Sequence, residues 1–238
     1  MPLKLEFKRS LNNKSFLFCF LTVLLSFVLG YILLISIDKI ENVTIQQLFF
    51  SVYTVFTKLG MMIFSIIIIY FINSDYKEKN ILFYKILGVD AKSYFLSKVI
   101  ILILWYSISI ILISTIVCFL YNNFSYLFIM INYLENSIIY IILIVSMFSF
   151  LFKNMLVVFC TNFFIWIMSI VMLTVFPNFK YIAYFDASNE VYNILEKYLE
   201  VGKTNWSTIN LLLYNLIIFI IVFFVITIFS KRWIKNGV

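Results

Sequence analysis

Six long apolar stretches constrain the fold of this chain more than any other feature. A helix needs about 20 mainly apolar residues to cross the hydrocarbon core of a bilayer. Six stretches approach or exceed that length, at roughly 16–37, 48–72, 97–121, 137–152, 155–176 and 209–230. The strict apolar–polar alternation of a membrane β-barrel is absent. The sequence therefore predicts an all-α integral membrane protein, with six spans in a single domain over residues 1–238.

Composition supports this fold class. The chain is 64% hydrophobic and only 12% charged, whereas an average soluble domain is about half apolar and a quarter charged. A soluble core of this size could not hide so much apolar surface. The fourth stretch is short, and an earlier start within 126–133 is left open. The first stretch is expected to remain as a span, because its apolar run is longer than that of a cleaved signal peptide.

The residue inventory excludes several chemistries. The chain has no His and only five Gly, and no pair of these glycines fits a phosphate-binding loop or a dinucleotide fingerprint. Its three cysteines lie in apolar runs without a CxxC spacing. We therefore expect no catalytic site, no metal and no bound cofactor in this chain. An intramembrane enzyme with a Ser/Lys pair stays as an alternative, although the chain contains no GxSxG motif.

The basic residues predict the orientation of the spans. Of the 18 Lys and Arg residues, 13 would lie on the side that holds both termini and four on the other, with Lys58 inside the second span. Basic residues concentrate on the cytoplasmic side of a membrane, so both termini are predicted to be cytoplasmic, in a plasma membrane. The net charge of +7 then needs no nucleic-acid partner, and it favours contact with anionic lipid. The Ile/Lys/Asn-rich composition is typical of an AT-rich genome, as in many Gram-positive bacteria.

Two segments outside the spans have an amphipathic pattern. Leu3, Phe7 and Leu11 share one helical face, which predicts a short helix on the inner membrane surface. The outer segment 177–208 contains a second amphipathic stretch that Asp186 or Ser188 could cap and Gly202 could end. A helix here could lie over a pore mouth or rest on lipid, and the pattern does not separate the two.

The cytoplasmic segment 73–98 is the most informative part of the chain. A polar stretch leads into the apolar run 81–87, then Gly88 stops the helix and a new helix starts near Asp90. So short a link cannot bury its own apolar residues. The segment therefore predicts a short helix that packs on the spans, on lipid or on a second protein.

Order, size and charge pattern resemble the permeases of ABC-2 type, exporter-class ABC transporters. In that family the link between the second and third spans is a coupling helix that sits in a cleft of the ATPase subunit. The resemblance rests on Asp75-Tyr-Lys-Glu-Lys-Asn-Ile-Leu, on Gly88-Val-Asp-Ala-Lys92 and on Lys98. Lys79-Asn80 departs from the usual Gly-Thr. The residues expected to contact the ATPase are Leu82, Phe83, Tyr84, Lys85 and Leu87.

A few polar and aromatic residues lie at membrane depth. Lys58 is the one charged residue away from the ends of the predicted spans, which contain no acidic residue to pair with it. A charge at that depth is costly, so it is a site hypothesis by default. Lys58 would meet an acidic substrate in a cavity, with Asn162 and Trp166 along the same path. The alternatives are snorkelling for Lys58, an interhelical contact for Asn162 and core packing for Trp166.

The resemblance implies a permease that exports an amphipathic or hydrophobic substrate. Small permeases of this composition resemble those for bacteriocin export, self-immunity and antimicrobial peptide resistance, which implies a peptide substrate. It also implies a dimer with a second permease copy or a related permease. ATP and Mg²⁺ would be bound by a separate ABC ATPase subunit. The alternative function is the substrate-binding membrane subunit of an uptake transporter, or a membrane sensor that transports nothing.

Overall fold

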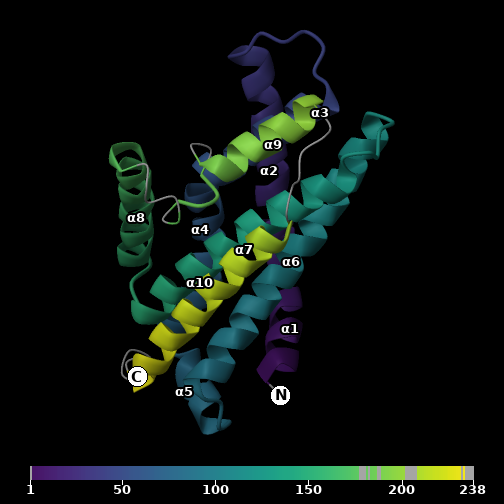
Figure 1. The fold of residues 1–238 in the computed structure, drawn as a ribbon. Coiled ribbons are helices and arrows are strands. Elements are labelled where there is room, and N and C mark those ends of the chain that lie inside the picture. The colour runs from purple at the N-terminus through teal and green to yellow at the C-terminus, as the bar shows by residue number, and fades with distance from the viewer. Residues whose placement is uncertain are drawn as a thin grey trace.

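The computed structural model describes residues 2–176, 181, 183–186, 189–201, 208–231 and 233. Within these residues there are helices and no strands (Figure 1). The helices are α1 (Pro2–Asn12), α2 (Ser15–Ser36), α3 (Ile45–Lys58), α4 (Gly60–Lys77), α5 (Asn80–Ile86), α6 (Ala91–Leu120), α7 (Leu127–Leu151), α8 (Met155–Val175), α9 (Glu190–Val201) and α10 (Thr208–Ile228).

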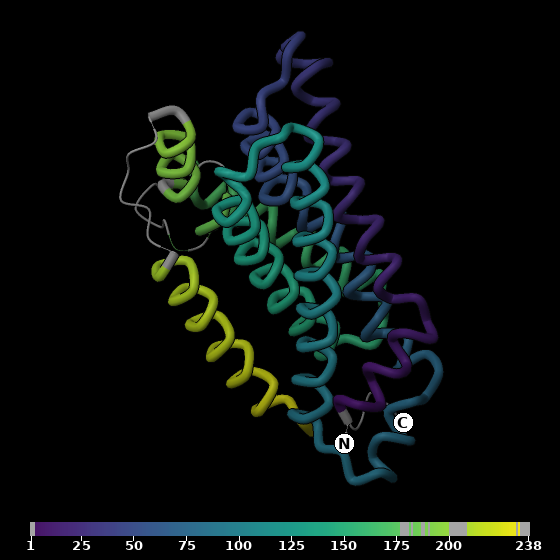
Figure 2. The backbone as a smooth tube through the Cα atoms, turned by 90° about the vertical axis from the view of Figure 1, so that its right-hand side faces the viewer, coloured from purple at the N-terminus to yellow at the C-terminus, as the bar shows by residue number. Residues whose placement is uncertain are grey.

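The helices include enough long apolar elements for a six-span bundle. Five of them, α2, α6, α7, α8 and α10, are each long and apolar enough to cross a membrane, and α3 and α4 together make up a sixth candidate. The N- and C-terminal ends of the bundle lie at the same end of the molecule, together with α5, and α9 lies across the opposite end (Figures 1 and 2). The predicted all-α membrane fold is confirmed.

The second and fourth stretches differ from the prediction. The single helix predicted at 48–72 is wrong, because the chain forms α3 and α4 with a bend of 59° between them. The break falls at Leu59, next to Gly60, and glycine is a common cause of helix kinks. The fourth span begins at Leu127, ten residues before the predicted start, within the alternative that the sequence left open. This earlier start brings Glu135 inside a helix, so the spans do contain an acidic residue.

The bundle is built around α7. This helix packs against α3, α4, α6, α8 and α10, and it is the most buried of the candidate spans. In contrast, α8 is the least buried. It contacts α4 and α7 along one stripe that includes Val158, Asn162 and Leu173. The remaining apolar surface of α8 faces outward, where lipid would cover it.

Near the outer end, α2 and α3 approach each other closely. Gly30 makes this possible, since a Cβ added there would lie 3.0 Å from the backbone nitrogen of Val52. The Ser51 hydroxyl donates to the carbonyl of Gly30 at 2.8 Å. A capping box begins α3, because Thr44 and Gln47 exchange hydrogen bonds between their side chains and backbone. These contacts hold the upper half of the broken span in place.

Candidate functional site

A residue with positive φ at each end separates α5 from α4 and α6. Lys79, before α5, has a φ of 57°, and Gly88, after it, has a φ of 71°. Both residues are in the left-handed region, which turns the chain sharply and which glycine adopts without steric cost. The amide of Val89 donates to the carbonyl of Tyr84 at 3.0 Å, which closes the helix end. The side chain of Asp90 then accepts the amide of Ser93 and caps α6. The predicted helix, stop and restart are confirmed.

The seven-residue helix α5 has one buried face and one exposed face. Ile81 and Tyr84 are buried against the bundle. Phe83 is 57% exposed and Ile86 is 83% exposed, and Lys85 and Leu87 are exposed beside them. Leu82 is half-buried. We call the group Phe83, Ile86 and Leu87 the exposed α5 face.

Tyr84 is the one predicted contact residue that the structure removes from this surface. It is only 4% exposed, and its ring lies 5.3 Å from that of Tyr94 on α6. The ring therefore anchors α5 to the bundle. Ile86 belongs to the apolar run of the link but was not among the residues expected to contact the ATPase, although its exposure is the largest on α5.

A buried ion network lies next to α5 and joins three helices. Lys98 of α6 lies 2.7 Å from a carboxylate oxygen of Glu6 on α1 and 2.7 Å from one of Asp75 on α4. Arg9 of α1 forms a second ion pair with Asp75, and the Tyr94 hydroxyl donates to Asp75 at 2.9 Å. Glu6, Asp75 and Lys98 are all buried. The amphipathic helix α1 is therefore fixed by charge to the ends of α4 and α6 that lie next to α5.

The network extends to the first residue of α5. Arg9 lies 3.1 Å from Glu78, and the Asn80 side chain donates to the same carboxylate at 2.7 Å and to Asp75 at 3.3 Å. Burial raises the pKa of Glu6, and Lys98 opposes that shift. The sequence analysis placed Asp75 and Lys98 in the segment 73–98, but it did not predict that they form an ion pair. Glu6 is far from both residues in the chain, so local spacing contains no signal for the cluster.

At the other end of the molecule, Lys58 has an acidic partner. Its Nζ lies 2.8 Å from Oδ1 of Asp186, which comes from the segment between α8 and α9. The sequence predicted that Lys58 has no acidic partner within the spans. Its partner comes instead from a segment outside them. The Asp186 side chain is 5% exposed and that of Lys58 is 33% exposed. Lys58 is the last residue of α3, so its charge lies at the break in the second span.

A small cavity adjoins this ion pair. Its volume is about 40 Å³, enough for a few water molecules. Four elements and the loop before α9 form its wall, through Phe56, Thr57, Met61, Ser137, Tyr140, Ile141, Trp166, Ser169, Ala183, Phe185 and Asp186. Thus Trp166 and Asp186, 20 positions apart in the chain, share one cavity with α3 and α7.

Trp166 and Asn162, the other residues of the predicted substrate path, lie in different places. Trp166 lines the cavity, and its indole Nε1 is buried without a hydrogen-bond partner among the described residues. Asn162 lies one turn away on the same stripe of α8 but is not part of the cavity wall. Its amide nitrogen donates to the carbonyl of Val158 at 2.9 Å. Trp166 therefore lies in the same cavity wall as Asp186, the partner of Lys58. Asn162 lies outside that wall.

The outer helix α9 packs on α3 above the cavity. Tyr192 and Thr54 share a hydrogen bond of 2.6 Å between their hydroxyls, and the Tyr192 ring lies 4.4 Å from that of Phe50. The expected helix in the outer segment is confirmed. Its expected stop at Gly202 lies outside the described residues.

These features define the class of the protein, a multi-pass helical membrane protein with a structured link at one end and a helix across the other. Comparison with known proteins gives the family. The chain belongs to the peptide export permease protein YydJ family, whose profile it matches over residues 3–238. It is 35% identical over 240 residues to the probable peptide export permease protein YydJ of Bacillus subtilis (strain 168), covering 99% of this chain and 100% of that protein. No solved structure matches the chain.

Proposed function

We propose that this protein is the permease subunit of an ATP-driven exporter of the ABC-2 type, and that it moves an amphipathic peptide outward across the plasma membrane. A separate ABC ATPase subunit binds ATP and Mg²⁺ and docks on α5. Two permease chains, identical or related, enclose the path. Closure of the ATPase pair on ATP moves α5, and the ion network passes that movement to α1, α4 and α6.

The exposed α5 face is the observation that carries this proposal. Phe83, Ile86 and Leu87 are exposed at the end of the bundle that holds both termini. Lys77, Glu78 and Lys79 precede them and are exposed too, which keeps the start of this link in water rather than in lipid. Burying an apolar side chain of this size is worth roughly 1.5–3 kcal/mol. A protein partner with an apolar cleft would therefore gain several kcal/mol from this face.

The family relationship supports a peptide as the transported substrate. The Bacillus subtilis relative is described as a probable peptide export permease, and this chain covers its full length. The assignment of peptide cargo to this chain rests on that likeness. The same peptide chemistry would suit bacteriocin export, self-immunity or resistance to an antimicrobial peptide.

Co-purification tests the docking role of α5. An affinity-tagged permease is co-expressed with the ABC-type ATPase of its export system, and the retained ATPase is measured by quantitative immunoblot. The double variant Phe83→Ala/Leu87→Ala should insert and fold but retain at least about tenfold less ATPase, because two apolar contacts are lost. The permease purified alone should hydrolyse no ATP.

Phe119→Ala/Leu120→Ala is the matched control. It removes the same two residue types from exposed positions at the opposite end of α6, and it should leave the retained ATPase unchanged. Normal retention and normal export by Phe83→Ala/Leu87→Ala would show that α5 is not the docking element.

A further inference from the structure

The ion pair between Lys58 and Asp186 joins the end of α3 to the wall of the cavity. Asp186 belongs both to the cavity wall and to a compact turn, in which its amide donates to the carbonyl of Ala183 at 2.9 Å. The side chain of Asn189 donates to the same carbonyl at 2.9 Å. The amide of Asn189, the residue before α9, donates to the carbonyl of Asp186 at 2.9 Å. A movement of Asp186 away from Lys58 would therefore displace the turn and widen the cavity.

The cavity, as it stands in this structure, is too small for a peptide. Its volume of about 40 Å³ holds water only, whereas pockets for organic ligands measure about 300–1,000 Å³. Any peptide that reaches Lys58 must therefore displace part of the wall. The turn at 183–186 is the part of the wall that no membrane-spanning helix contains.

We propose that Asp186 is an internal substitute for a carboxylate of the exported peptide, and that the Lys58–Asp186 pair is the latch of the outer gate. The peptide carboxylate takes the place of Asp186 on Lys58, and the turn with α9 then moves away from α3. This inference rests on the proposed function, since it assumes that a peptide reaches the cavity.

Two observations favour a carboxylate as the competing group. Lys58 offers a cation whose present partner is itself a carboxylate, at a hydrogen-bonding distance of 2.8 Å. Trp166 supplies a second donor on the same cavity, with a buried Nε1 that finds no acceptor among the described residues. A carboxylate has two oxygens and accepts several hydrogen bonds. It can therefore accept from an ammonium and an indole N–H at the same time, whereas an amide-capped chain end carries no charge to pair with Lys58.

The other contacts of the turn and α9 described here are uncharged: aromatic packing and a neutral hydrogen bond. Such contacts can break and form again as the segment moves. Phe185 contacts Tyr140 with 5.6 Å between ring centroids, and Tyr184 stacks on Tyr214 at 4.3 Å. The Tyr192–Thr54 hydrogen bond is a single neutral contact. The Lys58–Asp186 ion pair is a charged contact between this segment and α3, and its exchange for the peptide carboxylate is the step that releases the gate.

Cysteine labelling tests the latch without transport or an ATPase. In a protein that carries Cys19→Ala, Cys118→Ala and Cys160→Ala, Ser169→Cys places a thiol on the cavity wall. The rate of its reaction with a membrane-impermeant maleimide reports opening in nanodiscs. Asp186→Asn should raise that rate by roughly tenfold or more, because the lost contact joins Lys58 to a carboxylate that is 5% exposed, and a change of roughly 1.4 kcal/mol is enough for a tenfold shift.

Control variants separate a latch from a general loss of fold. Glu196→Gln removes the same charge from an exposed position on α9 and should leave the rate unchanged. The exchange Lys58→Asp/Asp186→Lys should return the rate to the value of the unmodified pair. An unchanged rate in Asp186→Asn, or a charge exchange that stays as open as the single variants, would overturn the latch.

A pair of probe peptides tests the carboxylate. N-acetyl-leucyl-phenylalanine, which ends in a carboxylate, should accelerate labelling of Ser169→Cys when Asp186 and Lys58 are intact, and its C-terminal amide should not. In Lys58→Gln neither probe should change the rate. Equal effects of the two probes would overturn the carboxylate role. Because labelling needs neither ATP nor export, these results are independent of the test of α5 docking.

Discussion

At the residue scale, buried charge is the main determinant of how the α5 end of the bundle is built. Lys98 has 2% of its side chain exposed and lies between Glu6 and Asp75, and Arg9 also pairs with Asp75, so two cations and two carboxylates share one site. Such a cluster is stable only while its charges are balanced, because each unpaired charge carries a large desolvation cost. The network therefore makes the position of α1 depend on single residues in α4 and α6.

Lys98→Met should destabilise the protein strongly. Removing one partner of a buried ion pair costs about 3–5 kcal/mol, and here two carboxylates lose the same cation. Thermal unfolding in detergent should show a large fall in the unfolding temperature, while Lys77→Met, an exposed lysine two residues after Asp75, should have almost no effect. Asp75→Asn should cost less free energy in the Lys98→Met background than in the wild-type protein. Equal costs in the two backgrounds would mean that the two residues are not coupled.

At the element scale, short turns with left-handed residues position α5. Lys79 and Gly88 bracket α5, and Asp90 starts α6 directly afterwards. An added Cβ on Gly88 would meet nothing within 4 Å, so the requirement for glycine there comes from the backbone conformation and not from crowding. The hydrogen bond from Ser93 lowers the pKa of Asp90, so this cap stays ionised at neutral pH.

Gly88→Ala should loosen α5 without disturbing the spans. A left-handed conformation costs a residue with a Cβ about 1–2 kcal/mol, which corresponds to a roughly 5- to 30-fold change in a local opening equilibrium. Hydrogen–deuterium exchange of a peptide covering residues 79–90 should be faster by that factor. Gly88→Asn should change exchange less, since asparagine tolerates this conformation better than alanine. Identical exchange in all three proteins would contradict the argument.

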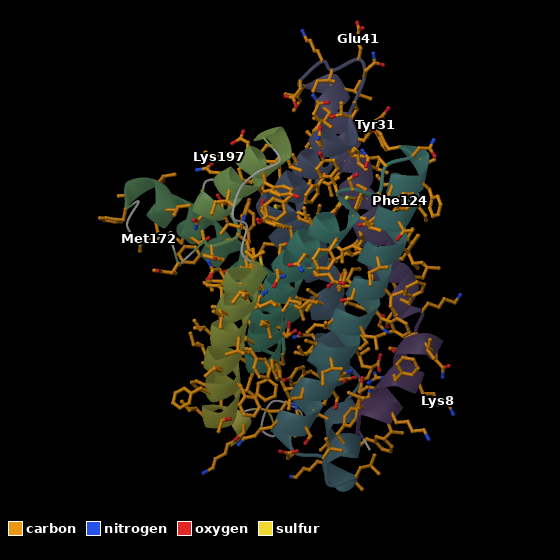
Figure 3. The ribbon with its side chains drawn as sticks, turned by 45° about the vertical axis from the view of Figure 1, so that its right-hand side comes forward. Lys8, Tyr31, Glu41, Phe124, Met172 and Lys197 are labelled. Atoms are coloured by element: carbon orange, nitrogen blue, oxygen red, sulfur yellow. The ribbon has the colours of Figure 1, made fainter. Side chains whose placement is uncertain are left out.

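At the scale of the whole molecule, the two ends of the bundle differ in structure and in charge. One end contains α1, α5 and both chain ends, and the other contains the loop around Glu41 and the helix α9 (Figures 1 and 3). Lys8 lies at the first end, and Lys197 and Glu41 lie at the second (Figure 3). Together with the excess of basic residues around the first end, this arrangement predicts that the α5 end is cytoplasmic.

Labelling in intact cells tests this orientation. In the cysteine-free background, Asn193→Cys on α9 should react with an impermeant maleimide from outside, and Lys79→Cys before α5 should react only after the cells are opened. Both positions are exposed, so accessibility within the protein does not limit either reaction. The reverse pattern would invert the orientation and move α5 to the outer surface.

The sequence determined the class of fold because hydrophobicity is a local property. Each apolar run of sufficient length forms a helix that suits a bilayer, whatever it packs against. The same holds for the α5 turn, where Gly88 and Asp90 act through their own backbone and their nearest neighbours. The expected helix before the last span followed in the same way from its amphipathic pattern.

Only the tertiary structure decided which distant residues meet. Asp186 pairs with Lys58 across 128 positions, and Lys98 joins Glu6 to Asp75. It also divided the second span at Leu59 and turned Tyr84 inward. The physical reason is that these outcomes depend on packing between helices, which brings together charges that have no periodic relation in the chain. Periodicity shows which face of one helix is apolar, but it carries no information about the residue that will lie opposite.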